Sequence, residues 1–119
     1  MNLIKFQLFS MFIIVYSSSE PPKLLPFLQK ITLKNGKTFK LSCSLLEGNE
    51  PIDYRWYKNN QRIRIDSRLY FETKSMNSML IFTNLIPDDS GNYSCQASNS
   101  HGYDRQSTLL QVKGKFKFI

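Results

Sequence analysis

The segment DSGNYSC at residues 89–95 carries a cysteine, Cys95, two positions after a tyrosine, Tyr93. The other cysteine of the chain is Cys43, and the lone tryptophan, Trp56, lies between the two cysteines in sequence. If the cysteines pair, they close a loop of about 53 residues, and the loss of chain entropy in the unfolded state stabilises the fold by about 4 kcal/mol. We expect Trp56 to pack on this bridge.

The N-terminal residues have the pattern of a cleavable secretion signal. Lys5 gives a positively charged start, residues 6–16 are mostly apolar, and serines follow at 17–19. The apolar stretch is too short to cross a bilayer, which needs about 20 apolar residues. Val15 and Ser17 suit the positions that precede a cleavage site, so we expect a signal at residues 1–17. The alternatives are an uncleaved anchor and a buried helix.

This signal would place the domain in an oxidising compartment, where an even number of cysteines favours a disulfide over a zinc site. The sequence after residue 17 is long enough for one domain but not for two. We expect that domain at 18–112, followed by a basic tail at 113–119. No later stretch has the length of a membrane span. We therefore expect a secreted or extracellular chain, or one at the plasma membrane if the sequence is part of a larger receptor.

Apolar residues recur at every second position, which indicates strands with one buried face. No segment shows the 3.6-residue period of an amphipathic helix. The inward-facing residues that this alternation predicts are Phe39, Leu41, Cys43 and Leu45; Tyr54 and Trp56; Leu80 and Phe82, with Leu85 at the end; Tyr93, Cys95 and Ala97; and Thr108, Leu110 and Val112.

Turn-forming residues separate these runs at short intervals, for example Asn35-Gly36 and Asn59-Asn60. Weaker strand candidates lie at 24–33, 62–65 and 69–73. Pro26 interrupts the first of them and argues for an edge strand. About seven short strands with a cysteine in the second and sixth predict an all-β fold of two packed sheets.

In this order and spacing the residues resemble the immunoglobulin superfamily, over about 21–112. The parts that carry the resemblance are Cys43, Trp56 within YRWYKN (54–59), LIFTNL (80–85) and the segment 89–95. The resemblance implies a Greek-key sandwich with a Cys43–Cys95 disulfide between its sheets. It also implies a structural core that contains Trp56, Leu80 and Tyr93.

Two further structural roles follow from this resemblance. The hydroxyl of Tyr93 is expected to bond back to upstream backbone, forming a tyrosine corner. Asp89 is expected to pair with a cation, for which Arg68 is the first candidate and Arg64 the second. An ordinary solvated cation is the alternative for either arginine.

The short spacing between Trp56 and Leu80 resembles the intermediate set (I-set) of adhesion molecules and receptors. The segments 21–27, 47–52 and 97–102 further resemble modules of arthropod Down syndrome cell adhesion molecule-like proteins. This resemblance implies homophilic or heterophilic cell adhesion, with neuronal guidance and self-avoidance as family functions. The alternatives are a soluble ligand or decoy for a receptor or growth factor, and a basic glycan-binding matrix protein.

The sequence offers no basis for catalysis. Its single histidine, His101, lies in a turn, and one histidine with two paired cysteines cannot build a metal site or a nucleophile–base pair. A phosphate-binding glycine loop is also missing from the sequence. We therefore expect no enzymatic activity, no cofactor and no metal.

The chain is basic, with 16 Lys and Arg against 9 Asp and Glu and a formal net charge of +7. A basic extracellular domain attracts sulfated glycans and acidic protein partners, whereas secretion argues against nucleic acid. Solubility and protection of sheet edges are the alternative reason for such charges. The densest groups are Lys34, Lys37 and Lys40; Arg55, Lys58, Arg62 and Arg64; and Lys113, Lys115 and Lys117.

Two surface features remain as candidate sites. Asn92-Tyr93-Ser94 is an acceptor sequence for N-linked glycosylation, with Asn92 and Ser94 expected to face outward. A binding domain of this kind would use a sheet face or its loops. The candidate binding surface consists of Tyr57, Gln96, Ser98 and Tyr103, and protein partners at the cell surface, including a second copy, are expected there.

Overall fold

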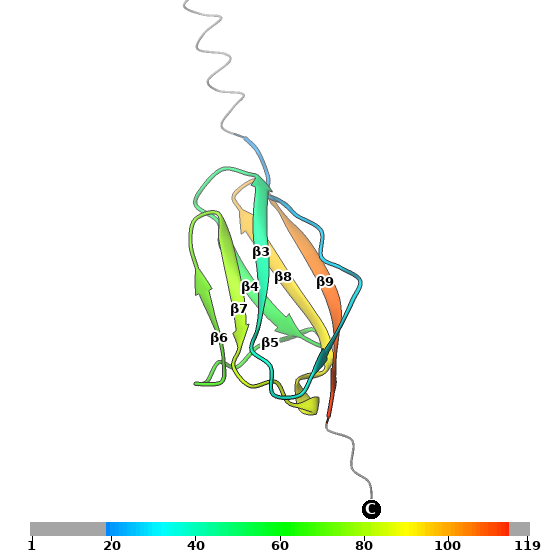
Figure 1. Cartoon of the computed structure of the whole chain (residues 1–119). Helices are drawn as coiled ribbons and strands as arrows, with labels where there is room; N and C mark the ends of the chain where they lie inside the picture. The colour runs from blue at the N-terminus through cyan, green and yellow to red at the C-terminus, as the bar shows by residue number, and fades with distance from the viewer. Residues whose placement is uncertain (1–18, 115–119) are drawn as a thin grey trace, which may run out of the picture.

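The computed structural model describes residues 19–114, which form a sandwich of two β-sheets (Figure 1). The strands in this range are β1 (Lys23–Leu24), β2 (Lys30–Lys34), β3 (Phe39–Glu47), β4 (Asp53–Lys58), β5 (Gln61–Arg62), β6 (Leu69–Thr73), β7 (Asn77–Phe82), β8 (Gly91–Asn99) and β9 (Gly102–Lys113). One sheet has the order β1-β3-β7-β6 and the other β2-β9-β8-β4-β5. A short 3-10 helix, η1 (Pro87–Asp89), lies between β7 and β8. The predicted all-β sandwich is confirmed.

The described range leaves out residues 1–18 and 115–119. The predicted signal at 1–17 lies outside the described residues, and so does most of the predicted tail at 113–119. Lys113, which was expected to begin that tail, is the last residue of β9 and lies in register with Lys34 of β2. Between residues 19 and 114, no helix is long and apolar enough to cross a membrane.

Alternation along the strands places the apolar side chains between the sheets. Leu41 of β3 lies opposite Leu80 of β7, and Trp56 of β4 lies opposite Cys95 of β8. All four side chains are buried. Because every second residue of a strand points to the same face, these pairs form one core, whose buried members are Leu24, Leu41, Cys43, Leu45, Tyr54, Trp56, Leu69, Leu80, Phe82, Leu85, Tyr93, Cys95, Ala97, Leu110 and Val112.

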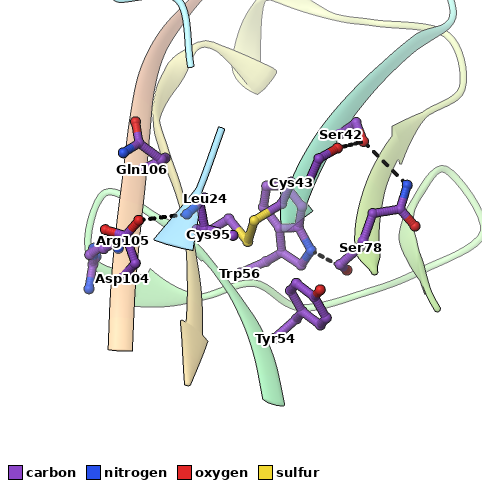
Figure 2. The surroundings of a disulfide bond; sticks show 12 residues. Leu24, Ser42, Cys43, Tyr54, Trp56, Ser78, Cys95, Asp104, Arg105 and Gln106 are labelled. Atoms are coloured by element: carbon purple, nitrogen blue, oxygen red, sulfur yellow. Dashed lines mark hydrogen bonds between the residues drawn. A yellow bond between two sulfur atoms is a disulfide. The ribbon is translucent and has the colours of Figure 1, made fainter. Parts of the chain in front are cut away.

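The segment at 24–33, which the sequence predicted as one edge strand, is two strands in different sheets. β1 pairs antiparallel with β3, whereas β2 pairs parallel with β9. Pro26 lies between β1 and β2, and proline cannot donate the hydrogen bond that a continued ladder would need. Side chains of β9 hold the crossing segment. The backbone amide of Leu24 donates to Asp104 Oδ2 at 2.8 Å (Figure 2). The backbone amide of Phe27 donates to Gln106 Oε1 at 3.2 Å.

The later strands agree with the sequence in position but differ in length. β6 covers the predicted range 69–73, whereas the candidate at 62–65 contributes only its first residue, within the two-residue β5. The turn between β4 and β5 uses Asn59 and Asn60, both with positive φ (49° and 68°). Two such residues match the twist of a tight hairpin. β9 begins at Gly102, well before the predicted inward residue Thr108, and it pairs with the whole of β8.

Candidate recognition surface

The two cysteines lie on β3 and β8, so their disulfide joins the two sheets (Figure 2). The predicted inter-sheet disulfide is confirmed. Trp56 lies beside it, and its indole Nε1 donates a hydrogen bond of 2.8 Å to the hydroxyl of Ser78. Sequence analysis did not single out Ser78. Ser78 lies two residues before Leu80 in the same strand, so the alternation along that strand could have predicted that it faces the core.

Arg68 and Asp89 form a bidentate ion pair in the structure. The two guanidinium nitrogens Nη1 and Nη2 each donate to one carboxylate oxygen at 2.8 Å. Burial alone would raise the pKa of Asp89. The hydrogen bonds from Arg68 and from the amide of Ile86 outweigh burial and lower that pKa below its usual value. Arg64, the second candidate partner, is exposed.

Tyr93 is buried, and its hydroxyl donates to the carbonyl oxygen of Asp89 at 2.5 Å. Burial, reinforced by the charge of Asp89, raises the pKa of the Tyr93 hydroxyl. Asp89 is therefore held by Arg68 through its side chain and by Tyr93 through its backbone. These groups satisfy one another's hydrogen bonds, which makes their role structural.

The outer face of the five-stranded sheet is different, because polar and aromatic side chains are accessible there. Tyr57 of β4 is half-buried, with the Arg105 guanidinium 4.5 Å and the Arg62 guanidinium 5.9 Å from its ring centroid. Arg105 also donates to Gln96 Oε1 at 3.4 Å and to Asn60 Oδ1 at 3.1 Å. We call this group (Tyr57, Asn60, Arg62, Gln96 and Arg105) the tyrosine–arginine cluster.

The other two predicted surface residues lie next to this cluster along the same face. Ser98 of β8 is in register with Tyr103 of β9, and Tyr103 is 67% exposed. Asp53 of β4 lies on the other side of Ser98 and pairs with Arg55 at 2.8 Å. The structure therefore brings the four predicted residues onto one face. Tyr57 and Gln96 belong to the tyrosine–arginine cluster, and Ser98 and Tyr103 lie beside it.

Arg105 is the member of this face that sequence analysis missed. The predicted last strand contained only residues near Thr108, so nothing indicated which way residue 105 would point. The start of β9 at Gly102 puts residues 103 and 105 on the outer face. The turn signal at 99–102, directly before Tyr103, could have supported the earlier start.

The glycosylation sequence has one exposed and one buried end. Asn92 is exposed, and its backbone N–H donates to Asn59 Oδ1 at 2.9 Å. Ser94 points to the outer face but is only 2% exposed, because it lies opposite Tyr57 and its hydroxyl is 2.7 Å from that of Ser107. Ser94 thus faces outward as expected, but β8 is an inner strand, and the side chains of the neighbouring strands cover the serine.

His101 is exposed in the turn between β8 and β9. In the described part of the chain, no group of three or more His, Cys, Asp or Glu residues is placed to hold a metal ion.

Residues 22–112 match the sequence profile of the immunoglobulin I-set domain. The chain belongs to this family. Human cell adhesion molecule DSCAM is 37% identical to the I-set chain over 82 residues, which are 69% of the chain and 4% of that protein. Human junctional adhesion molecule C is 38% identical over 77 residues, or 59% of the chain and 25% of that protein.

Among solved structures, the titin I-band fragment I67–I69 superposes on the I-set chain with a TM-score of 0.73 at 29% identity. The match covers 80% of the chain and 34% of the titin fragment. The chain spans only a small part of the curated relatives it matches. Its family consists of adhesion and structural modules, which confirms that the chain is not an enzyme.

Proposed function

We propose that the I-set chain is an extracellular recognition module in cell adhesion that binds a protein partner through the outer face of β4, β8 and β9. The observation that carries this proposal is the tyrosine–arginine cluster. Tyrosine and arginine supply most of the binding energy at many protein interfaces. Hydrogen bonds from Arg105 to Gln96 and Asn60 already order the guanidinium over the Tyr57 ring, so less entropy is lost on binding.

The charge of this face indicates the chemistry of the partner. Arg55, Arg62 and Arg105 lie on it against one carboxylate, Asp53, which already pairs with Arg55. Two copies packed by this face would bring like charges together, which is unfavourable. We therefore favour a heterophilic partner whose surface carries carboxylates around an aromatic or aliphatic anchor.

The relatives support an adhesion role in general terms, because one is named as a cell adhesion molecule and another as a junctional adhesion molecule. Neuronal guidance and self-avoidance are a narrower form of the proposal. Self-avoidance requires binding between copies, so it depends on a contact that overcomes the repulsion described above.

The test uses the full chain, secreted from cultured cells and made multivalent, because single modules bind weakly. An array of purified cell-surface ectodomains that includes the chain itself is probed with wild type and with Tyr57→Ala, Arg105→Ala and Tyr70→Ala. Tyr70 is a half-buried tyrosine on β6 of the other sheet and serves as the matched control. We expect Tyr57→Ala and Arg105→Ala to weaken binding by about tenfold or more.

Tyr70→Ala should leave binding unchanged. Equal losses in all three variants, or binding that survives both cluster substitutions, would reject this face as the interface. Binding to the chain itself with the same sensitivity would identify homophilic adhesion instead. Thermal unfolding of each variant separates loss of contact from loss of fold.

A further inference from the structure

Charged side chains are divided unequally between the two ends of the sandwich. Exposed carboxylates, Glu20, Glu47 and Glu50, gather at the end where β3 stops and β4 starts. At the opposite end, where β4 and β9 stop (Figure 1), residues 19–114 present six cations besides Arg68, which is paired with Asp89, together with the exposed carboxylates of Asp66 and Asp88. These cations are Lys34, Lys37, Lys58, Arg62, Arg64 and Lys113.

The first cationic site is a hollow of about 430 Å³ beside the β4–β5 hairpin. Lys58, Arg62 and Arg64 line it together with apolar Ile63 and Leu69. Both arginines are exposed, while Ile63 between them packs on the core. The Lys58 ammonium is held in place by a 2.6 Å hydrogen bond to the carbonyl oxygen of Asp88. None of these three cations forms an ion pair with a carboxylate in residues 19–114.

The second cationic site is a hollow of about 350 Å³ lined by Lys34, Asn35, Lys113 and Gly114. Lys34 and Lys113 are exposed and lie in register on the paired strands β2 and β9. Like charges at such close positions destabilise a sheet. A bound anion would remove that repulsion, and no carboxylate of the described chain does so.

Both hollows border η1. Lys58 of the first hollow bonds to the backbone of Asp88 in this helix. Gly114 of the second lies against Pro87, where an added Cβ would be 3.1 Å from the proline Cγ. A ligand that reaches both hollows must therefore carry several negative groups along a narrow chain that passes over η1 and the exposed carboxylate of Asp88.

We propose that this basic end binds a sulfated polysaccharide, with sulfate groups in both hollows. Each hollow has the volume of a small-ligand site, and the apolar floor of the first suits the carbon face of a sugar ring. Repeated sulfates match two separated sets of cations better than a compact acidic patch does. The site goes beyond the proposed protein recognition and does not depend on it.

The test measures binding of the full chain to a heparin dodecasaccharide and to its fully desulfated form, across a range of salt concentrations. Arg64→Gln and Lys113→Gln, one residue from each hollow, are combined in one variant that leaves the tyrosine–arginine cluster intact. Lys23→Gln with Lys74→Gln is the matched control, because it also removes two exposed cations but at the other end. Thermal unfolding confirms that both variants fold.

We expect the Arg64/Lys113 variant to bind the sulfated dodecasaccharide at least tenfold more weakly and to show a smaller salt dependence, since fewer counterions are released. The Lys23/Lys74 control should lose less than threefold, and the desulfated chain should not bind. Equal losses in the two variants would mean that only net charge matters and would overturn the proposal. Sedimentation at different salt concentrations tests the alternative that the basic end binds the acidic end of a second copy. Self-association that weakens with salt and is lost in the Arg64/Lys113 variant, while heparin binding is the same in both variants, would support that alternative and overturn the proposal.

Discussion

Arg68 binds both carboxylate oxygens of Asp89 at 2.8 Å and so ties the residue before β6 to the end of η1. The Asp89 side chain is 5% exposed and that of Arg68 is 31% exposed. The backbone carbonyl oxygen of Asp89 also accepts a hydrogen bond from the Tyr93 hydroxyl. This pair therefore fastens the entry to β8, the strand that holds one end of the disulfide.

Removing the arginine should destabilise the fold. Arg68→Ala leaves the Asp89 carboxylate buried with a single backbone donor, the amide of Ile86. We expect a loss of about 2–3 kcal/mol in the free energy of unfolding, below the full cost of breaking a buried pair because Arg68 is partly solvated. Urea unfolding measures it. Arg64→Ala is the control, and an equal loss there would contradict the assigned pair.

Acid should weaken the fold through Asp89. Its pKa is lowered in the folded state relative to about 3.9 in the unfolded chain. The stabilisation it gives is therefore complete above that unfolded pKa and is lost as pH falls through the folded value. Asp89→Asn should be less stable than wild type at pH 7, and the gap should narrow below about pH 4. Urea midpoints across pH measure the gap, and a constant gap would exclude this titration.

The Trp56–Ser78 hydrogen bond gives a prediction about the core. Ser78→Ala leaves the buried indole N–H without its acceptor, so we expect a loss of about 1–3 kcal/mol. Trp56→Ala should cost about 3–5 kcal/mol. In a Trp56→Phe background there is no indole N–H, so Ser78→Ala should cost less. A double-mutant cycle measures this coupling, and additive losses would show that the hydrogen bond contributes nothing.

The Cys43–Cys95 disulfide predicts that the protein isolated under non-reducing conditions has no free thiol. Intact mass after alkylation without reduction should show no modified thiol. Reduction should remove about 4 kcal/mol of stability, because the bridge closes a long loop. Two alkylated cysteines in the unreduced protein would contradict the bridge.

Glycosylation at Asn92 is a separate prediction. The exposed side chain leaves room for a sugar at the start of β8. Treatment with an amidase that releases N-linked glycans should lower the mass of the wild-type protein and leave Asn92→Gln unchanged. An unchanged wild-type mass would show that the acceptor is not used.

Sequence reasoning found the core because that core rests on local alternation and on a small set of spaced residues. Trp56, Tyr93 and both cysteines follow directly from these patterns. Pro26 marked a break in the N-terminal run, but the move of β2 to the other sheet depends on β9, which is distant in sequence. Nothing local predicted that Asp104 and Gln106 would hold the crossing segment.

The surface was harder to predict for the same reason. Four of its residues follow from alternation on the predicted strands and turn, but Arg105 needed the true start of β9. The hollow at the β4–β5 hairpin depends on how residues 58–69 fold back against the sheet. The pairing of Lys34 with Lys113 depends on a parallel register between strands far apart in sequence.

Arg62 belongs to both surfaces, since its guanidinium lies over the Tyr57 ring and its side chain also lines the first hollow. One cation shared by the two proposed binding sites would couple them thermodynamically. A polyanion that binds Arg62 in the hollow would remove its guanidinium from the Tyr57 ring, and a protein partner that holds Arg62 on the ring would withhold it from the polyanion. Thermodynamic linkage makes this antagonism equal in both directions. Measuring each affinity in the presence of the other ligand reveals it, and independent affinities would show that Arg62 serves only one site.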